Sequence, residues 1–256
     1  MSLNLPSEIS RDSWMGGIRH KFLLLGQEAW IVEPPEPLKE KLYFHVPEWP
    51  DAFPERNGVK ELLALGYYMI HIHVRNTFAN EEALRRMKAL YDFVQTLGFS
   101  PKGALIGMSL GGLFSFRYAA RYPETVACIY ADAPVCDLYY RKRQGRNDPE
   151  EISRAYGFGD QVEKLKDNAF SPVNNLQKLI QAKIPLLMIL GLNDTVVYAE
   201  DNGLLLADRY KAAGGEVELI TRNNWGHHPH GLDQPLGTIV RFILKHTWNK
   251  VGRVDQ

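Results

Sequence analysis

A six-residue segment, Gly107-Met108-Ser109-Leu110-Gly111-Gly112, constrains this chain more than any other part of its sequence. An apolar run, 103–106, precedes the segment, and a stretch typical of a helix, 113–120, follows it. At a sharp turn from strand to helix, the pattern Gly-x-Ser-x-Gly exposes a serine hydroxyl above the edge of a sheet. The flanking glycines remove Cβ atoms that would clash in such a turn. The segment therefore predicts Ser109 as a nucleophile.

Apolar runs of strand length alternate with amphipathic segments of helix length along most of the chain. Strands are predicted at 18–25, 27–32, 42–46, 67–74, 103–108, 126–131, 185–190 and 217–221, and helices at 57–65, 80–97, 109–121, 200–213 and 238–246. The first two strands predict a hairpin around Gly26, and residues 1–14 are expected to be irregular or partly helical. Strands separated by helices predict an α/β fold whose mostly parallel central sheet has helices on both faces.

A single domain is expected over residues 1–256, because no shift in composition divides the chain and its length suits one α/β core. Residues 137–183 interrupt the alternation with many charges and no strong strand. Long insertions between core strands usually serve function, so we expect this segment to form a small cap-like insertion over the carboxyl edge of the sheet. The basic residues inside it, Arg141, Lys142, Arg143 and Arg146, are interpreted as a solvated loop.

Two later loops carry the partners that a nucleophilic serine needs. A base must take the proton of the hydroxyl, and an acid must orient the base. In a sheet of this kind the acid and then the histidine follow the serine along the chain, each beyond the end of a strand. Asp194 and His227 meet this order and are predicted to complete a catalytic set with Ser109. Asp132 stays open as an alternative acid, and His228 as an alternative base.

An oxyanion hole is expected beside the serine. Its first donor is the backbone N–H of Leu110, at the start of the helix that follows the turn. Its second donor should come from the loop after the third strand. In this chain that expectation points to the backbone N–H of His45 or Val46.

Composition argues against several other classes of protein. Thirty basic and thirty acidic residues give a formal net charge of +0, whereas nucleic-acid binding usually requires a basic excess. The sequence contains neither of the Gly-rich phosphate-binding motifs G-x-x-x-x-G-K-[ST] and G-x-G-x-x-G, so no nucleotide or other cofactor is expected. His227, His228 and His230 lie close together, but no cysteine or carboxylate accompanies them at ligand spacing. No metal is therefore expected, and His230 is interpreted as structural.

The location of the protein is also an expectation from the sequence. No stretch reaches the about 18 apolar residues that span a bilayer, and the first residues lack the pattern of a signal peptide. We therefore expect a cytoplasmic protein without a membrane partner, although removal of a secretory signal peptide would leave the same sequence. Whether the chain forms a homo-oligomer is left open.

The three loops together resemble those of the α/β-hydrolase superfamily over nearly the whole chain. More narrowly, the segments VACIYADAPVCDL, AFSPVNNL and WGHHPHGL resemble a subgroup of bacterial esterases that is described as prolyl-oligopeptidase-like and associated with carbohydrate use. The resemblance implies the α/β-hydrolase fold. It also implies acetylated or otherwise esterified sugars as substrates.

The predicted function is that of a serine hydrolase, most simply a carboxylesterase that cleaves small or sugar-borne esters through an acyl-enzyme. A peptidase of the same fold is one alternative, which the small cap disfavours. A lipase is another, which the charged character of residues 137–183 disfavours. A binding protein that keeps the fold without its activity is the non-enzymatic alternative.

Overall fold

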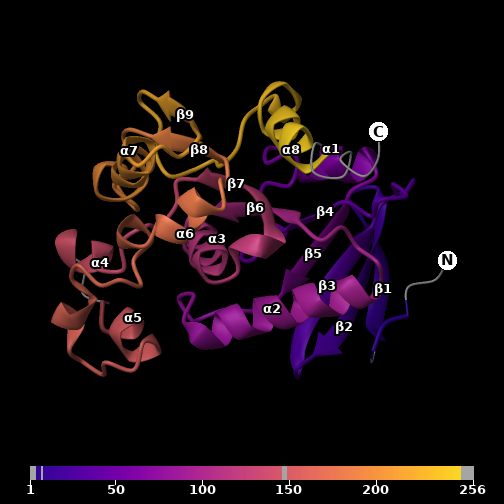
Figure 1. Cartoon of the computed structure of the whole chain (residues 1–256), viewed down its shortest axis with the longest axis horizontal. Coiled ribbons are helices and arrows are strands. Elements are labelled where there is room, and N and C mark those ends of the chain that lie inside the picture. The colour runs from indigo at the N-terminus through magenta and orange to yellow at the C-terminus, as the bar shows by residue number, and fades with distance from the viewer. Residues whose placement is uncertain (1–3, 7, 146–148, 249–256) are drawn as a thin grey trace.

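A mixed sheet forms the centre of the molecule in the computed structural model, which describes residues 4–6, 8–145 and 149–248 (Figure 1). Its nine strands follow one another in the order β1-β2-β3-β5-β4-β6-β7-β8-β9. Their bounds are β1 (Glu8–Trp14), β2 (Gly17–Leu24), β3 (Gln27–Glu33), β4 (Tyr43–His45), β5 (Tyr68–Ile72), β6 (Gly103–Met108), β7 (Val126–Asp132), β8 (Leu186–Gly191) and β9 (Val217–Arg222). The predicted α/β class and the eight predicted strands are confirmed.

The half of the sheet from β5 to β9 is parallel, because each neighbouring pair in the order β5-β4-β6-β7-β8-β9 runs in the same direction. Every residue of β5, β6, β7 and β8 is buried. Burial on both faces explains why these strands are nearly continuous apolar runs in the sequence. Because these strands are parallel, their carboxyl ends meet along one edge of the sheet, where the loops that follow them can come together.

The other half of the sheet contains a strand that the sequence did not predict. Residues Glu8–Trp14 form β1, which pairs antiparallel with β2, so the expectation of an irregular or helical start is wrong. The two strands are joined at Met15 and Gly16, both with positive φ, as a tight hairpin turn requires. All but the last residue of β1 are exposed. An edge strand of polar residues lacks the apolar alternation on which the prediction depended, and its hydrogen bonds to β2 decide its structure instead.

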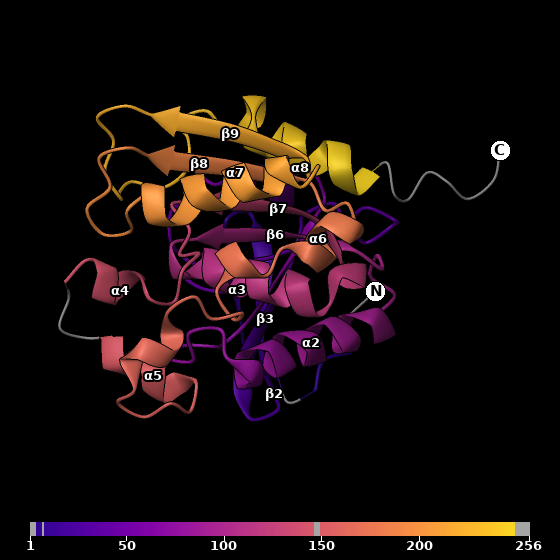
Figure 2. The same ribbon diagram turned by 60° about the vertical axis from the view of Figure 1, so that its left-hand side comes forward.

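Helices cover both faces of the sheet, as predicted (Figures 1 and 2). On one face α1 (Val59–Ala64) and α8 (Ile239–Trp248) pack over residues such as Ile106 and Ile189. On the other face α2 (Glu81–Thr96), α3 (Leu110–Arg121), α6 (Gln177–Gln181) and α7 (Leu205–Ala212) pack over residues such as Leu105 and Met188. Neighbouring residues of one strand thus serve opposite cores, as the period of two requires. Within the described part of the chain, no helix combines the length and the apolar character needed to cross a membrane.

The insertion at 137–183 divides into two parts. Its first part holds α4 (Tyr140–Arg143) and α5 (Pro149–Ala155), which lie on the side toward which β8 and β9 point (Figure 2). Its last part includes α6, which packs against α3 and so belongs to the helical layer. The single domain and the cap-like role of the first part stay predictions.

Candidate active site

The turn between β6 and α3 holds Ser109 in a strained backbone conformation, with φ 50° and ψ −119°. Two contacts with β7 and the loop after it fix the turn: the Ser109 N–H donates to the Asp132 carbonyl at 2.9 Å, and the Ser109 carbonyl accepts from Val135 N at 2.9 Å. A Cβ atom at Gly107 would lie 2.5 Å from the Gly111 carbonyl oxygen, which is too close for any side chain. The turn is therefore possible only with glycine at that position, as the sequence motif predicted.

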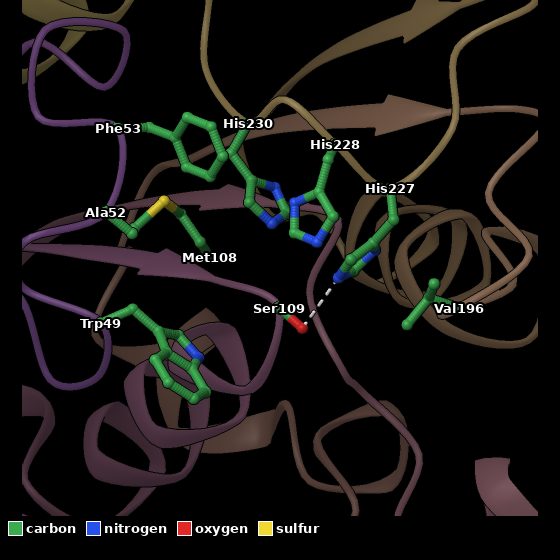
Figure 3. Close-up of a pocket in the computed structure, with 9 residues that line it drawn as sticks. All are labelled: Trp49, Ala52, Phe53, Met108, Ser109, Val196, His227, His228 and His230. Atoms are coloured by element: carbon green, nitrogen blue, oxygen red, sulfur yellow. Dashed lines mark hydrogen bonds between the residues drawn. The ribbon is translucent and has the colours of Figure 1, made fainter.

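A continuous chain of hydrogen bonds leads away from the Ser109 hydroxyl, and Figure 3 shows its first link, to His227. Ser109 Oγ lies 3.0 Å from His227 Nε2, and His227 Nδ1 lies 2.6 Å from Asp194 Oδ2. His227 is 8% exposed and Asp194 is 6% exposed, so little water competes for these contacts. The structure thus brings together the three residues that the sequence named as the catalytic set, from loops after β6, β8 and β9.

The carboxylate of Asp194 is held in position to accept a hydrogen bond from the N–H of His227 Nδ1. Its second oxygen accepts hydrogen bonds from the backbone N–H groups of Val196 at 2.8 Å and Val197 at 2.9 Å. Burial alone would raise the pKa of Asp194, but the hydrogen bond from His227 and those from the two backbone N–H groups outweigh it. The net pKa lies below the ordinary value, so the carboxylate is ionised at neutral pH.

Asp132, the alternative acid, has a different partner. Its Oδ1 lies 2.7 Å from His230 Nδ1, and its Oδ2 accepts from the backbone N–H of Gly231 at 2.9 Å. Arg222 Nη2 lies 3.9 Å from the same carboxylate. The structure therefore places Asp132 on His230 rather than on His227, and it gives His230 the structural contact that the sequence had suggested in general terms.

The histidine loop is fastened by further contacts to its backbone. Arg56 Nε donates to the His230 carbonyl at 2.8 Å, and Arg222 Nη1 donates to the Gly231 carbonyl at 2.9 Å. Inside the loop, Trp225 Nε1 donates to the Pro229 carbonyl at 3.2 Å. These contacts fix the direction of the loop, so that His227 rather than His228 meets the hydroxyl of Ser109.

The structure places the residues that were predicted as oxyanion donors in different surroundings. Leu110 is the first residue of α3, where a backbone N–H has no partner within the helix. The Val46 N–H instead donates to the Ile70 carbonyl at 3.1 Å, so the prediction that it faces the oxyanion is wrong. The hydrogen-bond ladder between β4 and β5 extends one residue beyond β4, and it takes up this donor.

His45 lies inside β4, where it pairs with residues of both β5 and β6. Its ring packs 6.4 Å from that of Tyr118 on α3, in the helical layer below the site. Burial lowers the pKa of His45 to about 3, so the ring is neutral. His45 is thus a core residue, and the prediction that it contributes to the oxyanion hole is not supported by this placement. The chain comes nearer to α3 at Glu48, whose carbonyl oxygen would lie 3.6 Å from a Cβ atom at Gly111.

One cavity contains the serine, and a second lies against the neighbouring residue Leu110. The first has a volume of about 340 Å³ and contains Ser109 together with mostly apolar side chains (Figure 3). Its lining residues are Trp49, Ala52, Phe53, Met108, Ser109, Val196, His227, His228 and His230. The loop 47–54 thus shapes this cavity together with Met108 and Val196.

The second cavity, of about 410 Å³, shares Trp49 with the first and lies against Leu110. Its polar side chains are Glu48, Arg75, Asn76, Arg141 and Glu151, and its apolar ones include Phe78 and Phe114. Arg141 was expected in a solvated loop, but its side chain is 12% exposed and lies 3.3 Å from Glu151. Arg146 of the same basic group lies outside the described residues.

Glu48 is the least expected residue in the second cavity. It is 4% exposed, its Oε1 lies 3.9 Å from Arg75 Nε, and its Oε2 has no hydrogen-bond partner among the described residues. Burial raises the pKa of Glu48 to about 7, although the charge of Arg75 acts in the opposite direction. No motif in the sequence distinguishes this glutamate from an exposed one in a proline-rich loop.

Comparisons with known proteins identify relatives of the chain. The family model described as the prolyl oligopeptidase family matches residues 86–249, which is more than half of the chain. The chain is 25% identical over 216 residues to acylamino-acid-releasing enzyme 1 of Oryza sativa subsp. japonica, covering 74% of this chain and 27% of the rice protein. The chain therefore spans only about a quarter of the length of this relative.

Solved structures share the fold at low sequence identity. Porphyromonas gingivalis dipeptidyl peptidase 4 matches with a TM-score of 0.67 and 17% identity, over 90% of this chain and 36% of that one. An esterase/lipase from an uncultured bacterium matches with a TM-score of 0.67 and 17% identity, over 93% of this chain and 87% of that one. These matches show that the fold is the α/β-hydrolase fold, as the sequence predicted.

The buried carboxyl of Glu48 predicts a change of stability with pH. The folded chain holds its proton up to about pH 7, whereas the unfolded chain loses it near the ordinary value of 4.5. The stability that depends on a protonated Glu48 is thus fully present below about pH 4.5 and is lost as the pH rises to about 7. Glu48→Gln, which stays neutral, should gain in Tm relative to the wild type between about pH 5 and about pH 8, measured by thermal unfolding.

Glu36→Gln is the control for this measurement, because it removes the same charge from an exposed position. A difference in Tm between Glu48→Gln and the wild type that stays constant across this pH range would contradict the placement of Glu48.

Proposed function

Since the chain belongs to the prolyl oligopeptidase family, we propose that it is a serine hydrolase that uses Ser109, His227 and Asp194. The observation that carries the proposal is the unbroken path from Ser109 Oγ through both nitrogens of His227 to Asp194, with distances of 3.0 Å and 2.6 Å. Because the Asp194 carboxylate accepts a hydrogen bond from the N–H of Nδ1, the lone pair of Nε2 faces the hydroxyl. That is the tautomer that a base needs.

The proposed reaction has two halves. Ser109 Oγ attacks the substrate carbonyl while His227 takes its proton, and His227 then gives that proton to the leaving group as the acyl-enzyme forms. A water molecule attacks the acyl-enzyme in the second half, with His227 again as the base. The backbone N–H of Leu110 stabilises the oxyanion in both halves. We assign the second oxyanion donor to the turn at Glu48 and Trp49, which lies beside the start of α3.

The substrates that we propose are carboxylic esters of small or sugar alcohols. The cavity around Ser109 is mostly apolar and small, which suits a short acyl group or a compact alcohol. The neighbouring cavity offers carboxylates, guanidinium groups and the ring of Trp49, which suit a group rich in hydroxyls. The segments that resemble carbohydrate-associated esterases support the same substrate class.

Peptide hydrolysis is the second candidate function, and the family match favours it. The rice relative is named an acylamino-acid-releasing enzyme, and the P. gingivalis neighbour a dipeptidyl peptidase. The same three residues would serve either reaction, since both pass through an acyl-enzyme. The two functions therefore differ in the leaving group that the cavities accept.

Two comparisons test the proposal: esters against anilides as substrates, and the wild type against Ser109→Ala. We expect kcat/KM for p-nitrophenyl acetate and acetylated sugars to exceed that for N-acyl amino-acid p-nitroanilides. In Ser109→Ala, kcat should fall by roughly 10⁴- to 10⁶-fold, because no other group forms the acyl-enzyme. A fluorophosphonate probe should label the wild type and leave Ser109→Ala unlabelled, with circular dichroism as the check on folding. Faster cleavage of the anilides would favour the peptidase, and near-normal activity of Ser109→Ala would exclude the assignment of the nucleophile.

Asp194 and Asp132 are both buried and each is bonded to a histidine, so they give a matched test of the acid. Asp194→Asn should lower kcat by roughly 10⁴-fold, because the amide favours the wrong tautomer of His227. Asp132→Asn makes the same carboxylate-to-amide change, but on the residue that contacts His230 rather than His227. It should therefore lower kcat far less than Asp194→Asn does. Steady-state kinetics of both variants with one ester measure the difference. An equal or larger loss in Asp132→Asn would mean that the acid has been assigned to the wrong residue.

A further inference from the structure

Three imidazoles converge on the cavity above Ser109. The ring centroids of His227, His228 and His230 lie 4.8, 4.8 and 4.9 Å apart, and one nitrogen of each lies within 4.8 Å of those of the other two. All three rings line the same cavity, and the close-up shows them side by side (Figure 3). The Phe53 ring packs against His228 at 5.9 Å and against His230 at 5.6 Å, which supports the group from the side of the 47–54 loop.

Two of the three rings are oriented by buried carboxylates. His227 Nδ1 lies 2.6 Å from Asp194, and His230 Nδ1 lies 2.7 Å from Asp132. A carboxylate that accepts from Nδ1 leaves the lone pair on Nε2. Histidines that bind metal ions in proteins are commonly oriented by a carboxylate in this way. Asp194 and Asp132 lie far from these histidines in the sequence, but the fold brings them to the Nδ1 atoms of His227 and His230.

The third ring, that of His228, lines the same cavity and is adjustable. His228 is also exposed, so its side chain can turn without disturbing the core. Such movement is needed, because two nitrogens that share a tetrahedral zinc ion lie about 3.4 Å apart, given Zn–N bonds of about 2.0–2.1 Å.

From this geometry we propose that His227, His228 and His230 form an inhibitory site for a divalent transition-metal ion, with Zn²⁺ as the best fit. Neutral imidazoles are preferred ligands of Zn²⁺, and three of them leave one position for water. The ionised Asp194 behind His227 adds a favourable negative charge. The metal would occupy the lone pair of His227 Nε2, which the reaction uses to take the proton of Ser109. The inhibition rests on the proposed function, whereas the binding does not.

The test measures inhibition and binding separately. Zinc sulfate is titrated against ester hydrolysis by the wild type and His228→Gln in a buffer free of chelators, and each rate is divided by that protein's own zinc-free rate. His228→Gln should raise the zinc concentration for half-inhibition by at least about tenfold, because one of three ligands is lost. EDTA should restore the rate, and magnesium sulfate should leave it unchanged, because Mg²⁺ prefers oxygen ligands.

Binding is measured without activity by competition with a chromophoric zinc chelator, using Ser109→Ala as the parent protein. We expect one tight zinc per chain, weakened by a further His228→Gln substitution and unaffected by His73→Gln, a change outside the cavity. If zinc binds in this assay but the wild type hydrolyses no ester, the proposed function fails and the site stands. Equal zinc affinity with and without His228, or equal half-inhibition in the two enzymes, would overturn the site.

Discussion

The left-handed backbone of Ser109 is the constraint on which the rest of the site depends. A φ of 50° is unfavourable for serine, and the turn persists because β7 and the following loop bond to both sides of the peptide. This turn lifts the hydroxyl to the edge where the parallel strands end. The loops after β8 and β9 reach that same edge. The position of the Ser109 hydroxyl therefore determines where His227 and Asp194 must lie in order to contact it and each other.

Two carboxylate–histidine pairs lie side by side at this edge, and the structure uses them differently. In one pair, His227 has the Ser109 hydroxyl as the partner of its second nitrogen. In the other, Asp132 bonds both His230 and the backbone of Gly231, which anchors the loop that carries His227. In the proposed mechanism, one pair activates Ser109, whereas the other pair positions the loop. The neighbouring geometry also explains why a metal ion would compete with the proposed proton transfer.

Sequence patterns could predict the nucleophile turn, the order of acid and histidine, and most of the sheet. These features are local: a glycine motif specifies the turn, and buried parallel strands are apolar runs. The strand β1 escaped prediction because most of its residues are polar and exposed, and only pairing with β2 defines it. The oxyanion donor at Val46 was misplaced because the extent of the β4–β5 ladder is a tertiary property. Glu48 and the Asp132–His230 contact depend on segments far apart in sequence, which no local pattern encodes.

We propose Ser109 as the activated nucleophile and the Leu110 N–H as a donor to the oxyanion. A crystal structure of the protein after reaction with diethyl p-nitrophenyl phosphate is the sharpest test of both roles. We expect phosphorus bonded to Ser109 Oγ, with the phosphoryl oxygen about 2.7–3.1 Å from the Leu110 N–H nitrogen. An adduct on any other residue, or a phosphoryl oxygen that points away from the start of α3, would contradict this proposal.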